Sequence, residues 1–158
     1  MSLVEALRRI RSVADYQFGK GVGQRLFPSD VKIAFSRRTG RIRYVYLNGE
    51  RLVTMRPTDG FFSLSIAGAQ RIAEKAAFAE CFVTVKDSVS KYIADDGDVF
   101  AAHVVRADGE IRSKDEVTVL DEKGRILAVG RAVLSGDEML AFKRGVAVKV
   151  RHGWTKEG

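Results

Sequence analysis

Apolar residues near the start of the chain recur with the period of an α-helix. They follow one another at spacings of four, three, four and four residues: Leu3, Leu7, Ile10, Ala14 and Phe18. Such positions share one helix face, so the segment predicts an amphipathic helix whose apolar side faces a core. Ser2 and Glu5 form the sequence pattern of a capping box at its start, and the glycines of 19–23 indicate its end.

From Val31 onwards the apolar period changes to two, which is the pattern of a half-buried β-strand. A second alternating run, 41–47, leads into Asn48 and Gly49, the dipeptide that type I′ hairpin turns prefer. Two more strands and an Ala-rich helix complete this half: 51–55, 61–65 and about 67–77. The pattern predicts a helix followed by an antiparallel meander.

Short strands separated by turn residues fill the second half of the chain: 82–85, 99–105, 117–120, 126–134 and 146–150. A short helix is predicted after Asp87 and Ser88, whose side chains can cap it. Regularly punctuated short strands of this kind are typical of a small barrel. With a junction near Glu80, the sequence predicts an α+β protein of two units, 1–80 and 81–158.

Composition narrows the class of protein. The chain has 158 residues, of which 46% are apolar and 30% charged, the balance of a soluble globular protein. No apolar run reaches the length of a membrane helix, and the first residues lack the pattern of a signal peptide, so we expect a cytoplasmic protein without a membrane partner. Cys81 is the only cysteine, which excludes an internal disulfide, and with His103 and His152 it is too little for a zinc cluster.

Charge is distributed unevenly between the two halves. Residues 1–80 carry fourteen Lys and Arg against seven acids, whereas residues 81–158 carry thirteen of each, so the net charge of +7 lies in the first half. A basic surface attracts phosphate backbones through counterion release. The alternative left open is that the charge only keeps the protein soluble.

Arginines are densest between positions 37 and 56, where Glu50 is the only acid. On a β-strand, Arg41 and Arg43 share one face, and Ile42, Tyr44 and Tyr46 share the other. The cationic face predicts a phosphate-contacting surface, with Arg41 and Arg43 as its RNA-binding candidates. A solvated sheet face with both tyrosines in the core accounts for the same pattern.

Sequence motifs of catalysis are missing from the chain. The segment 19–23 lacks the Gly-Lys-Ser/Thr ending of a P-loop and follows a helix, so it predicts a helix stop. No Gly-x-Ser-x-Gly elbow occurs, and neither histidine lies in a zinc-protease pattern. Asp95, Asp96 and Asp98 resemble the start of a calcium loop, but Arg106 occupies the twelfth position, where an EF-hand needs Glu. We therefore expect neither cofactor nor metal.

Motifs spread over residues 80–153 resemble a PUA domain, a small RNA-binding pseudobarrel. The resemblance rests on 83–89, 93–100 and the closing segments 126–139 and 145–151. The first half is similar to the extension that precedes the PUA domain in archaeal tRNA-guanine transglycosylase and archaeosine synthase. That similarity rests on 14–19 with Gly21, Leu26 and Phe27, then on Ser36, 39–43, Arg56 and 59–60.

The resemblance implies an RNA-binding protein rather than an enzyme, because the transglycosylases place catalysis in a separate barrel that the sequence lacks. It implies tRNA as the RNA, and a tRNA-modifying enzyme of the archaeosine branch as a possible partner. Carried onto this chain, the RNA face of PUA domains falls on the first short helix, the following loop and strand, and the last strand: Ser88, Val89, Lys91, Gly97, Asp98, Val99, Phe100, Lys149, Arg151 and His152.

Physical chemistry assigns roles to some of these residues. Gly97 lets the backbone approach RNA closely, while Lys149 and Arg151 share a strand face and are expected to face solvent and bind phosphate. Phe100 packs either a base or, as we expect, the core. Two other functions stay open: a ligand-binding or catalytic protein that uses a cleft between the domains, and a protein-interaction adaptor.

Overall fold

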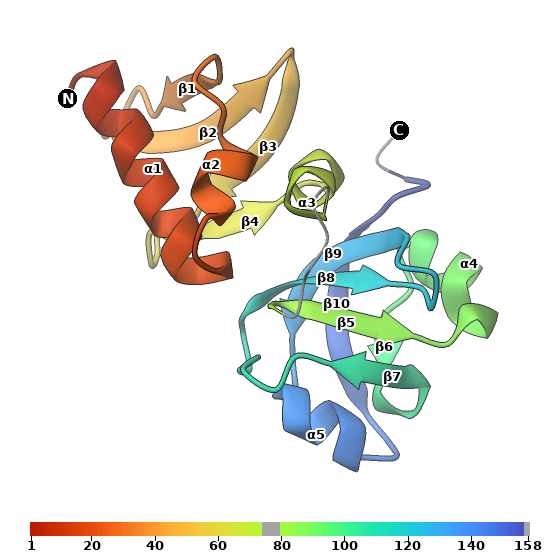
Figure 1. The fold of residues 1–158 in the computed structure, drawn as a ribbon. Helices are drawn as coiled ribbons and strands as arrows, with labels where there is room; N and C mark the ends of the chain where they lie inside the picture. Colours follow the sequence, from red (N-terminus) through yellow and green to blue (C-terminus); the bar gives the residue numbers. More distant parts are fainter. Residues whose placement is uncertain (74–79, 157–158) are drawn as a thin grey trace. The chain divides into compact units, whose positions relative to one another are not determined.

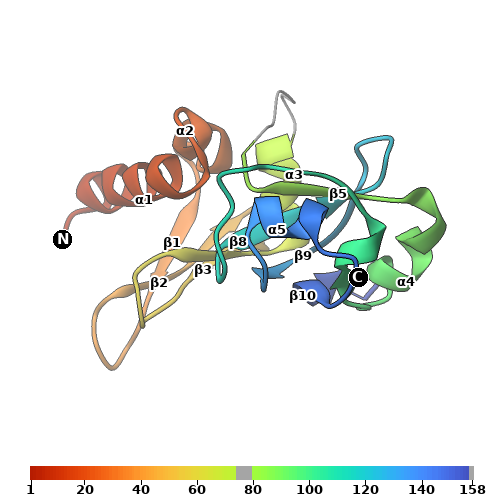
Figure 2. The same cartoon turned by 90° about the horizontal axis from the view of Figure 1, so that it is seen from below.

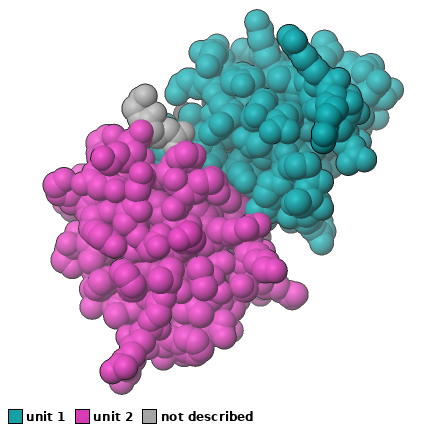
Figure 3. Space-filling model, turned by 180° about the vertical axis from the view of Figure 1, so that it is seen from behind, with its two compact units in different colours: residues 1–76 teal, residues 77–158 magenta. Residues whose placement is uncertain are grey.

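The computed structural model describes residues 1–73 and 80–156. The chain divides into two compact units, Met1–Ala76 and Ala77–Gly158, which Figure 3 shows in different colours. Each unit has its own buried apolar residues and is described by itself. Both mix helices with sheet, which confirms the predicted α+β class.

Unit 1 is a four-stranded antiparallel meander, in the order β1-β2-β3-β4, with helices at both ends of its sequence (Figure 1). Its elements are α1 (Leu3–Phe18), α2 (Val22–Leu26), β1 (Lys32–Phe35), β2 (Ile42–Leu47), β3 (Glu50–Met55), β4 (Phe62–Leu64) and α3 (Ile66–Ala73). Residues 74–77 of the predicted second helix lie outside the described residues. Asn48 and Gly49 turn the chain between β2 and β3 with φ of 52° and 83°, which confirms the predicted hairpin.

The buried face of α1 begins about one helical turn later than predicted, at Ala6 and not at Leu3. Ala6, Ile10 and Ala14 are fully buried, whereas Leu3 is 70% exposed. The Ser2 side chain accepts the N–H of Glu5 at 3.1 Å, so the first turn is capped although it lies outside the core. The helix ends as predicted, at a glycine with positive φ.

Helix α2 was not predicted from the sequence, because its five residues are too few to show a period. The Asp15 carboxylate accepts the N–H of Gly23 at 2.7 Å and thereby satisfies the start of α2. Gly23 is required by close packing, since a Cβ there would lie 2.3 Å from the Arg11 carbonyl oxygen. Arg11 in turn donates its Nε–H to the Phe27 carbonyl at 2.9 Å, which ties α1 to the end of α2.

Unit 2 is a six-stranded sheet, in the order β6-β10-β9-β8-β5-β7, that curls around an apolar core (Figure 1). Its elements are β5 (Phe82–Val85), η1 (Asp87–Val89), α4 (Ser90–Ala94), β6 (Val99–Phe100), η2 (Ala101–His103), β7 (Val104–Ala107), β8 (Glu116–Leu120), β9 (Ile126–Ala132), α5 (Gly136–Ala141) and β10 (Val146–Gly153). Strands β5 and β8 pair in parallel, and all other neighbours are antiparallel. The single strand expected over 99–105 is interrupted by η2 and forms two strands, β6 and β7. β6 lies at one edge of the sheet and β7 at the other.

Candidate RNA interface

Two similar turns lie together at one end of the sheet of unit 1. In a meander, the first and third connections fall at the same end, and Figure 2 shows the orange β1–β2 turn beside the yellow β3–β4 turn. In each turn the first residue donates its N–H to the carbonyl of the last residue, at 2.7 Å in 36–41 and 2.8 Å in 56–61. Gly40 and Gly60 supply the positive φ, 72° and 75°, that closes each turn.

Between and around these turns lies a groove of about 810 Å³, which we call the arginine groove. Five cationic side chains line it: Arg9, Arg38, Arg41, Arg43 and Arg56. Among its lining residues, all of which the structure describes, Asp59 is the one acid. Asp59 is committed to the turn, because it accepts the N–H of Phe61 at 2.9 Å and pairs with Arg56 at 3.1 Å. The remaining arginines leave the groove strongly positive.

The sequence rule for the β2 face fails at Arg43. Along β1, Ala34 pairs with Tyr44 and Phe35 pairs with Ile42, so Arg43 is an extra residue in a β-bulge. The bulge breaks the alternation of side chains, and Tyr44 lies on the outside with Arg43 instead of in the core with Ile42. The expectation that the tyrosines share the buried face of Ile42 is wrong for both, because Val45 between them is buried and Tyr44 and Tyr46 are half-buried on the other side.

Arg43 and Tyr44 form one exposed unit beside the arginine groove. The guanidinium carbon lies 5.3 Å from the centre of the Tyr44 ring, and Nε donates to the phenol oxygen at 3.1 Å. This hydrogen bond, together with the charges of Arg43 and Arg51, lowers the pKa of Tyr44 below its usual range. The Tyr46 ring follows at 6.1 Å, so planar aromatic and guanidinium groups are neighbours here.

In unit 2, the acidic cluster after α4 holds the last strand in place. Asp98 accepts the N–H of Val150 at 2.9 Å, and Asp96 accepts the N–H of Gly153 at 2.6 Å. Within the described residues, no group of three or more His, Cys, Asp and Glu side chains is placed to hold a metal ion. The Asp98 side chain thus supports β10 by accepting a backbone N–H of that strand.

Lys149 and Arg151 do not share an exposed face. Opposite β9, Val150 pairs with Gly130 and His152 with Val129, so Arg151 is a bulge residue. Its guanidinium makes a two-pronged ion pair with the fully buried carboxylate of Glu116, with 2.9 Å between Nη1 and Oε1. The expectation that Arg151 faces solvent is wrong. Lys149 is 76% exposed, as expected, with the Asp98 carboxylate 4.0 Å away.

The other candidate residues of unit 2 fall into two groups. Val99 is fully buried in the core, because this strand residue points inward. Phe100 is 39% exposed at the sheet edge, against the expectation of a core position, and its ring meets that of His103 edge-on at 6.3 Å. Ser88 and Lys91 are exposed, and Val89 and His152 are half-buried.

Gly97 and its surroundings show residues that sequence reasoning missed. A Cβ at Gly97 would lie 2.4 Å from the Tyr92 ring, so the glycine makes room for Tyr92. Tyr92 is itself 54% exposed, and Arg131 is exposed directly across from Lys149 in the β9–β10 ladder. No sequence motif marks either residue; the ladder register places Arg131 beside Lys149.

Cys81 is unsuited to nucleophilic chemistry. Burial, followed by the nearby Asp108 carboxylate, raises the pKa of its thiol to about 12. The Cys81 N–H donates to that carboxylate at 2.7 Å, and this hydrogen bond holds Cys81 in the turn before β5.

Among the described residues, no helix is both long and apolar enough to cross a membrane.

Each of the two units matches a known protein domain. Residues 8–78 match the patch-forming domain C2 of tRNA-guanine transglycosylase, and residues 82–154 match the PUA domain. After these matches we refer to unit 1 as the C2 domain and to unit 2 as the PUA domain. The C2 match contains all five arginines of the arginine groove, and the PUA match contains every candidate of unit 2.

Archaeal tRNA-guanine(15) transglycosylases are among the curated proteins that this chain is similar to. That of Methanothermobacter thermautotrophicus is 39% identical over 95% of this chain, and that of Pyrococcus abyssi is 42% identical over 94%. The chain spans only about a quarter of the length of these relatives, 23% and 25% respectively. The C2 and PUA domains are thus the parts that they share with this chain.

Solved structures confirm the arrangement of elements. A hypothetical protein of Pyrococcus horikoshii matches the whole chain with a TM-score of 0.77 and 25% identity, and the match covers 98% of that protein. A conserved PUA domain protein of Thermoplasma acidophilum matches 97% of the chain with a TM-score of 0.67 and 24% identity, covering 91% of that protein. The second likeness shows the fold alone.

Proposed function

We propose that the chain binds tRNA and that the arginine groove of the C2 domain contacts its phosphates. The observation that carries the proposal is the convergence of five arginines on one groove whose single acid is already paired. Guanidinium groups match phosphate oxygens in geometry as well as charge. The related proteins are named for an activity on tRNA, which makes tRNA the first polyanion to test.

On the PUA domain, the exposed candidates are proposed as further contacts with RNA: Ser88, Lys91, Phe100 and Lys149. Tyr92 and Arg131 join them, because both are exposed beside these residues in sequence or across the ladder. Val99, Asp98 and Arg151 act through the fold instead, as core residue, strand anchor and partner of Glu116.

The test is equilibrium binding of end-labelled tRNA, followed by fluorescence anisotropy at several salt concentrations. If the arginine groove contacts phosphates, log affinity falls linearly with log salt, with a slope of about −3 or steeper. A protein-interaction adaptor would give no saturable binding to tRNA. Binding with a slope near zero would also contradict the proposal, since phosphate contacts release counterions.

We further propose that the chain acts as an RNA-binding partner in archaeosine-type tRNA modification and does not itself exchange bases. Two observations support this proposal. The chain matches the C2 and PUA domains, and the thiol of its one cysteine has a strongly raised pKa. The purified chain should incorporate no labelled guanine into tRNA, even with zinc supplied. Measurable turnover by the chain alone would overturn this second proposal and leave the first intact.

A further inference from the structure

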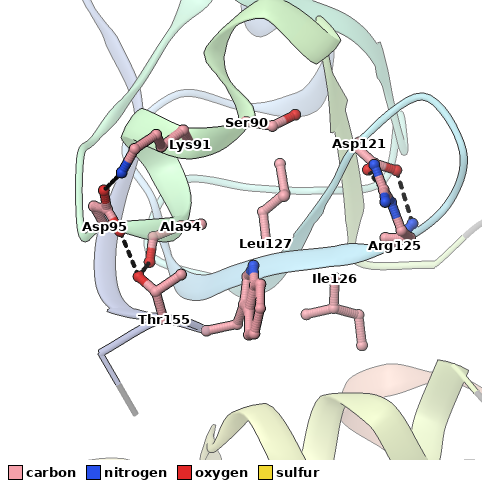
Figure 4. A pocket seen from close by; sticks show the side chains of 10 residues that line it. Ser90, Lys91, Ala94, Asp95, Asp121, Arg125, Ile126, Leu127 and Thr155 are labelled. Atoms are coloured by element: carbon pink, nitrogen blue, oxygen red, sulfur yellow. Dashed lines mark hydrogen bonds and ion pairs between the residues drawn. The ribbon is translucent and has the colours of Figure 1, made fainter. Parts of the chain in front are cut away.

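A pocket of about 320 Å³ lies in the PUA domain on the side of α4 that faces β9 (Figure 4). Its residues come from α4, from the turn between β8 and β9, from β9 and from the segment after β10: Ser90, Lys91, Ala94, Asp95, Asp121, Arg125, Ile126, Leu127, Trp154 and Thr155. We call it the indole pocket, after Trp154. Its size is at the lower end of the range of small-molecule sites.

Trp154 is exposed but firmly held. The residue is 54% exposed, although its backbone N–H donates to the Leu127 carbonyl at 2.9 Å. On one side Gly153 is bonded to Asp96, and on the other the Thr155 hydroxyl lies 2.5 Å from both the Ala94 carbonyl and the Asp95 carboxylate. An exposed aromatic ring on an anchored backbone is a preorganised stacking surface.

The opposite parts of the pocket offer an apolar wall and one hydroxyl. Figure 4 shows Leu127 reaching up between α4 and the β8–β9 turn, with the Ser90 hydroxyl pointing towards the side of Asp121 and Arg125. The Ser90 oxygen is buried and has no hydrogen-bond partner among the described residues. Such an atom is rare in folded proteins and marks a place where a ligand can complete a hydrogen bond.

The rim of the pocket carries two ion pairs whose cationic side chains are exposed. Lys91 pairs with Asp95 and Arg125 with Asp121, at 2.8 and 2.7 Å. Both cationic side chains are largely exposed, 89% and 71%, so either can contact an anion without leaving the surface. The pocket therefore combines a flat aromatic face, an apolar wall, cations at its edge and one hydroxyl, that of Ser90, without a hydrogen-bond partner among the described residues.

We propose that the indole pocket binds one unpaired nucleobase of RNA, stacked on Trp154 and hydrogen-bonded to the Ser90 hydroxyl. The inference rests on the proposed RNA binding and deepens it, because a nucleobase is the part of RNA that is flat and has a polar edge. Unstacked bases are commonly held on aromatic side chains, and the flanking phosphates lie where rim cations reach them. A base inside a duplex has its faces stacked on neighbouring base pairs and its polar edge occupied by its pairing partner, so it does not enter.

Trp154 is the only tryptophan of the chain, so its fluorescence reports on this pocket alone. Three probes are titrated: a short single-stranded oligoribonucleotide, its abasic counterpart and a blunt RNA duplex, with binding followed independently by anisotropy of an end label. The single strand should quench the fluorescence of Trp154 by stacking, and the duplex should leave it unchanged. The abasic strand should bind through phosphates without quenching.

Variants separate stacking from charge. Trp154→Leu should weaken binding of the single strand by about tenfold, and Trp154→Phe by less than about threefold. Ser90→Ala should weaken it by about threefold, and Leu140→Ala, which removes a similarly exposed apolar side chain on α5, should change nothing. None of the four should alter the salt slope, since no phosphate contact is removed.

Two results would overturn the inference while leaving tRNA binding intact: anisotropy shows binding but Trp154 fluorescence is unchanged, or the abasic strand quenches as strongly as the intact one. Unchanged affinity in Trp154→Leu, with its fold verified by circular dichroism, would do the same. Failure of both tRNA and oligoribonucleotide to bind would overturn the proposed function, and this inference with it.

Discussion

In the C2 domain, Arg38, Arg41 and Arg43 reach a groove whose one acid among the described lining residues is already paired, whereas in the PUA domain four basic side chains face carboxylates. There Arg151 pairs with Glu116, Arg125 with Asp121, Lys91 with Asp95, and Lys149 lies near Asp98. The two domains thus use the same residue types for different purposes. Among the described residues, Arg38, Arg41 and Arg43 have no acidic partner and are available to phosphates. In the PUA domain, Arg151 instead holds the sheet through Glu116, and Arg125 holds the β8–β9 turn through Asp121.

The largest expected effect breaks a paired cation of the PUA domain. Arg151→Ala removes the ion pair that Arg151 makes with the buried Glu116 carboxylate, so it should lower the free energy of unfolding of this domain by about 2–3 kcal/mol. Lys149→Ala, which removes an exposed cation two residues away, should cost less than about 0.5 kcal/mol. Urea unfolding followed by Trp154 fluorescence reads the PUA domain directly. Equal midpoints for the two variants would show that Arg151 is not structural.

A smaller effect is expected from removing the acid of the arginine groove. Asp59→Asn keeps an acceptor for the Phe61 N–H and removes the negative charge, so tRNA should bind about two- to threefold more tightly at low salt. Glu110→Gln makes the same charge change at an exposed site of the PUA domain and should have less effect. Equal gains in both variants would mean that net charge, and not the groove, attracts tRNA.

The smallest effect concerns Tyr44. Because the Arg43 hydrogen bond and charge favour the phenolate, Tyr44 should ionise at lower pH than an ordinary tyrosine, and Arg43→Ala should raise the pKa of Tyr44 back towards its usual range. The difference in phenolate absorbance between the wild-type protein and Tyr44→Phe isolates this group. Bound tRNA should raise the pKa of Tyr44 if a phosphate takes Arg43 away from it. Identical titrations with and without Arg43 would contradict the contact.

Local chemistry made part of the fold predictable. Three features depend only on residues that are close in sequence: the first helix, the Asn48-Gly49 hairpin and the dense arginines of 37–56. All three are found in the structure. Both motifs that resembled the transglycosylase extension at 36–43 and 56–60 prove to be the turns that build the arginine groove.

Strand faces were less predictable, because they depend on pairing with distant residues. A single bulge at Arg43 carries Tyr44 to the outside, and another at Arg151 turns that side chain onto Glu116. Each bulge follows from the register between two strands, which the sequence of one strand does not contain. The structure gives Gly97 a role that the sequence did not show, because a Cβ there would meet the Tyr92 ring; contact of Gly97 with RNA stays a prediction.

The most direct test of the account compares tRNA binding by Arg41→Ala/Arg43→Ala with that by Lys143→Ala/Arg144→Ala, two double variants with the same loss of charge at exposed positions of the two domains. If the unpaired arginines of the groove hold phosphates, the first variant should lose about tenfold or more in affinity and flatten the slope of log affinity against log salt by about two phosphate equivalents. The second should keep the wild-type slope. Equal slopes and equal affinities in the two variants would contradict the assignment of phosphate binding to the arginine groove.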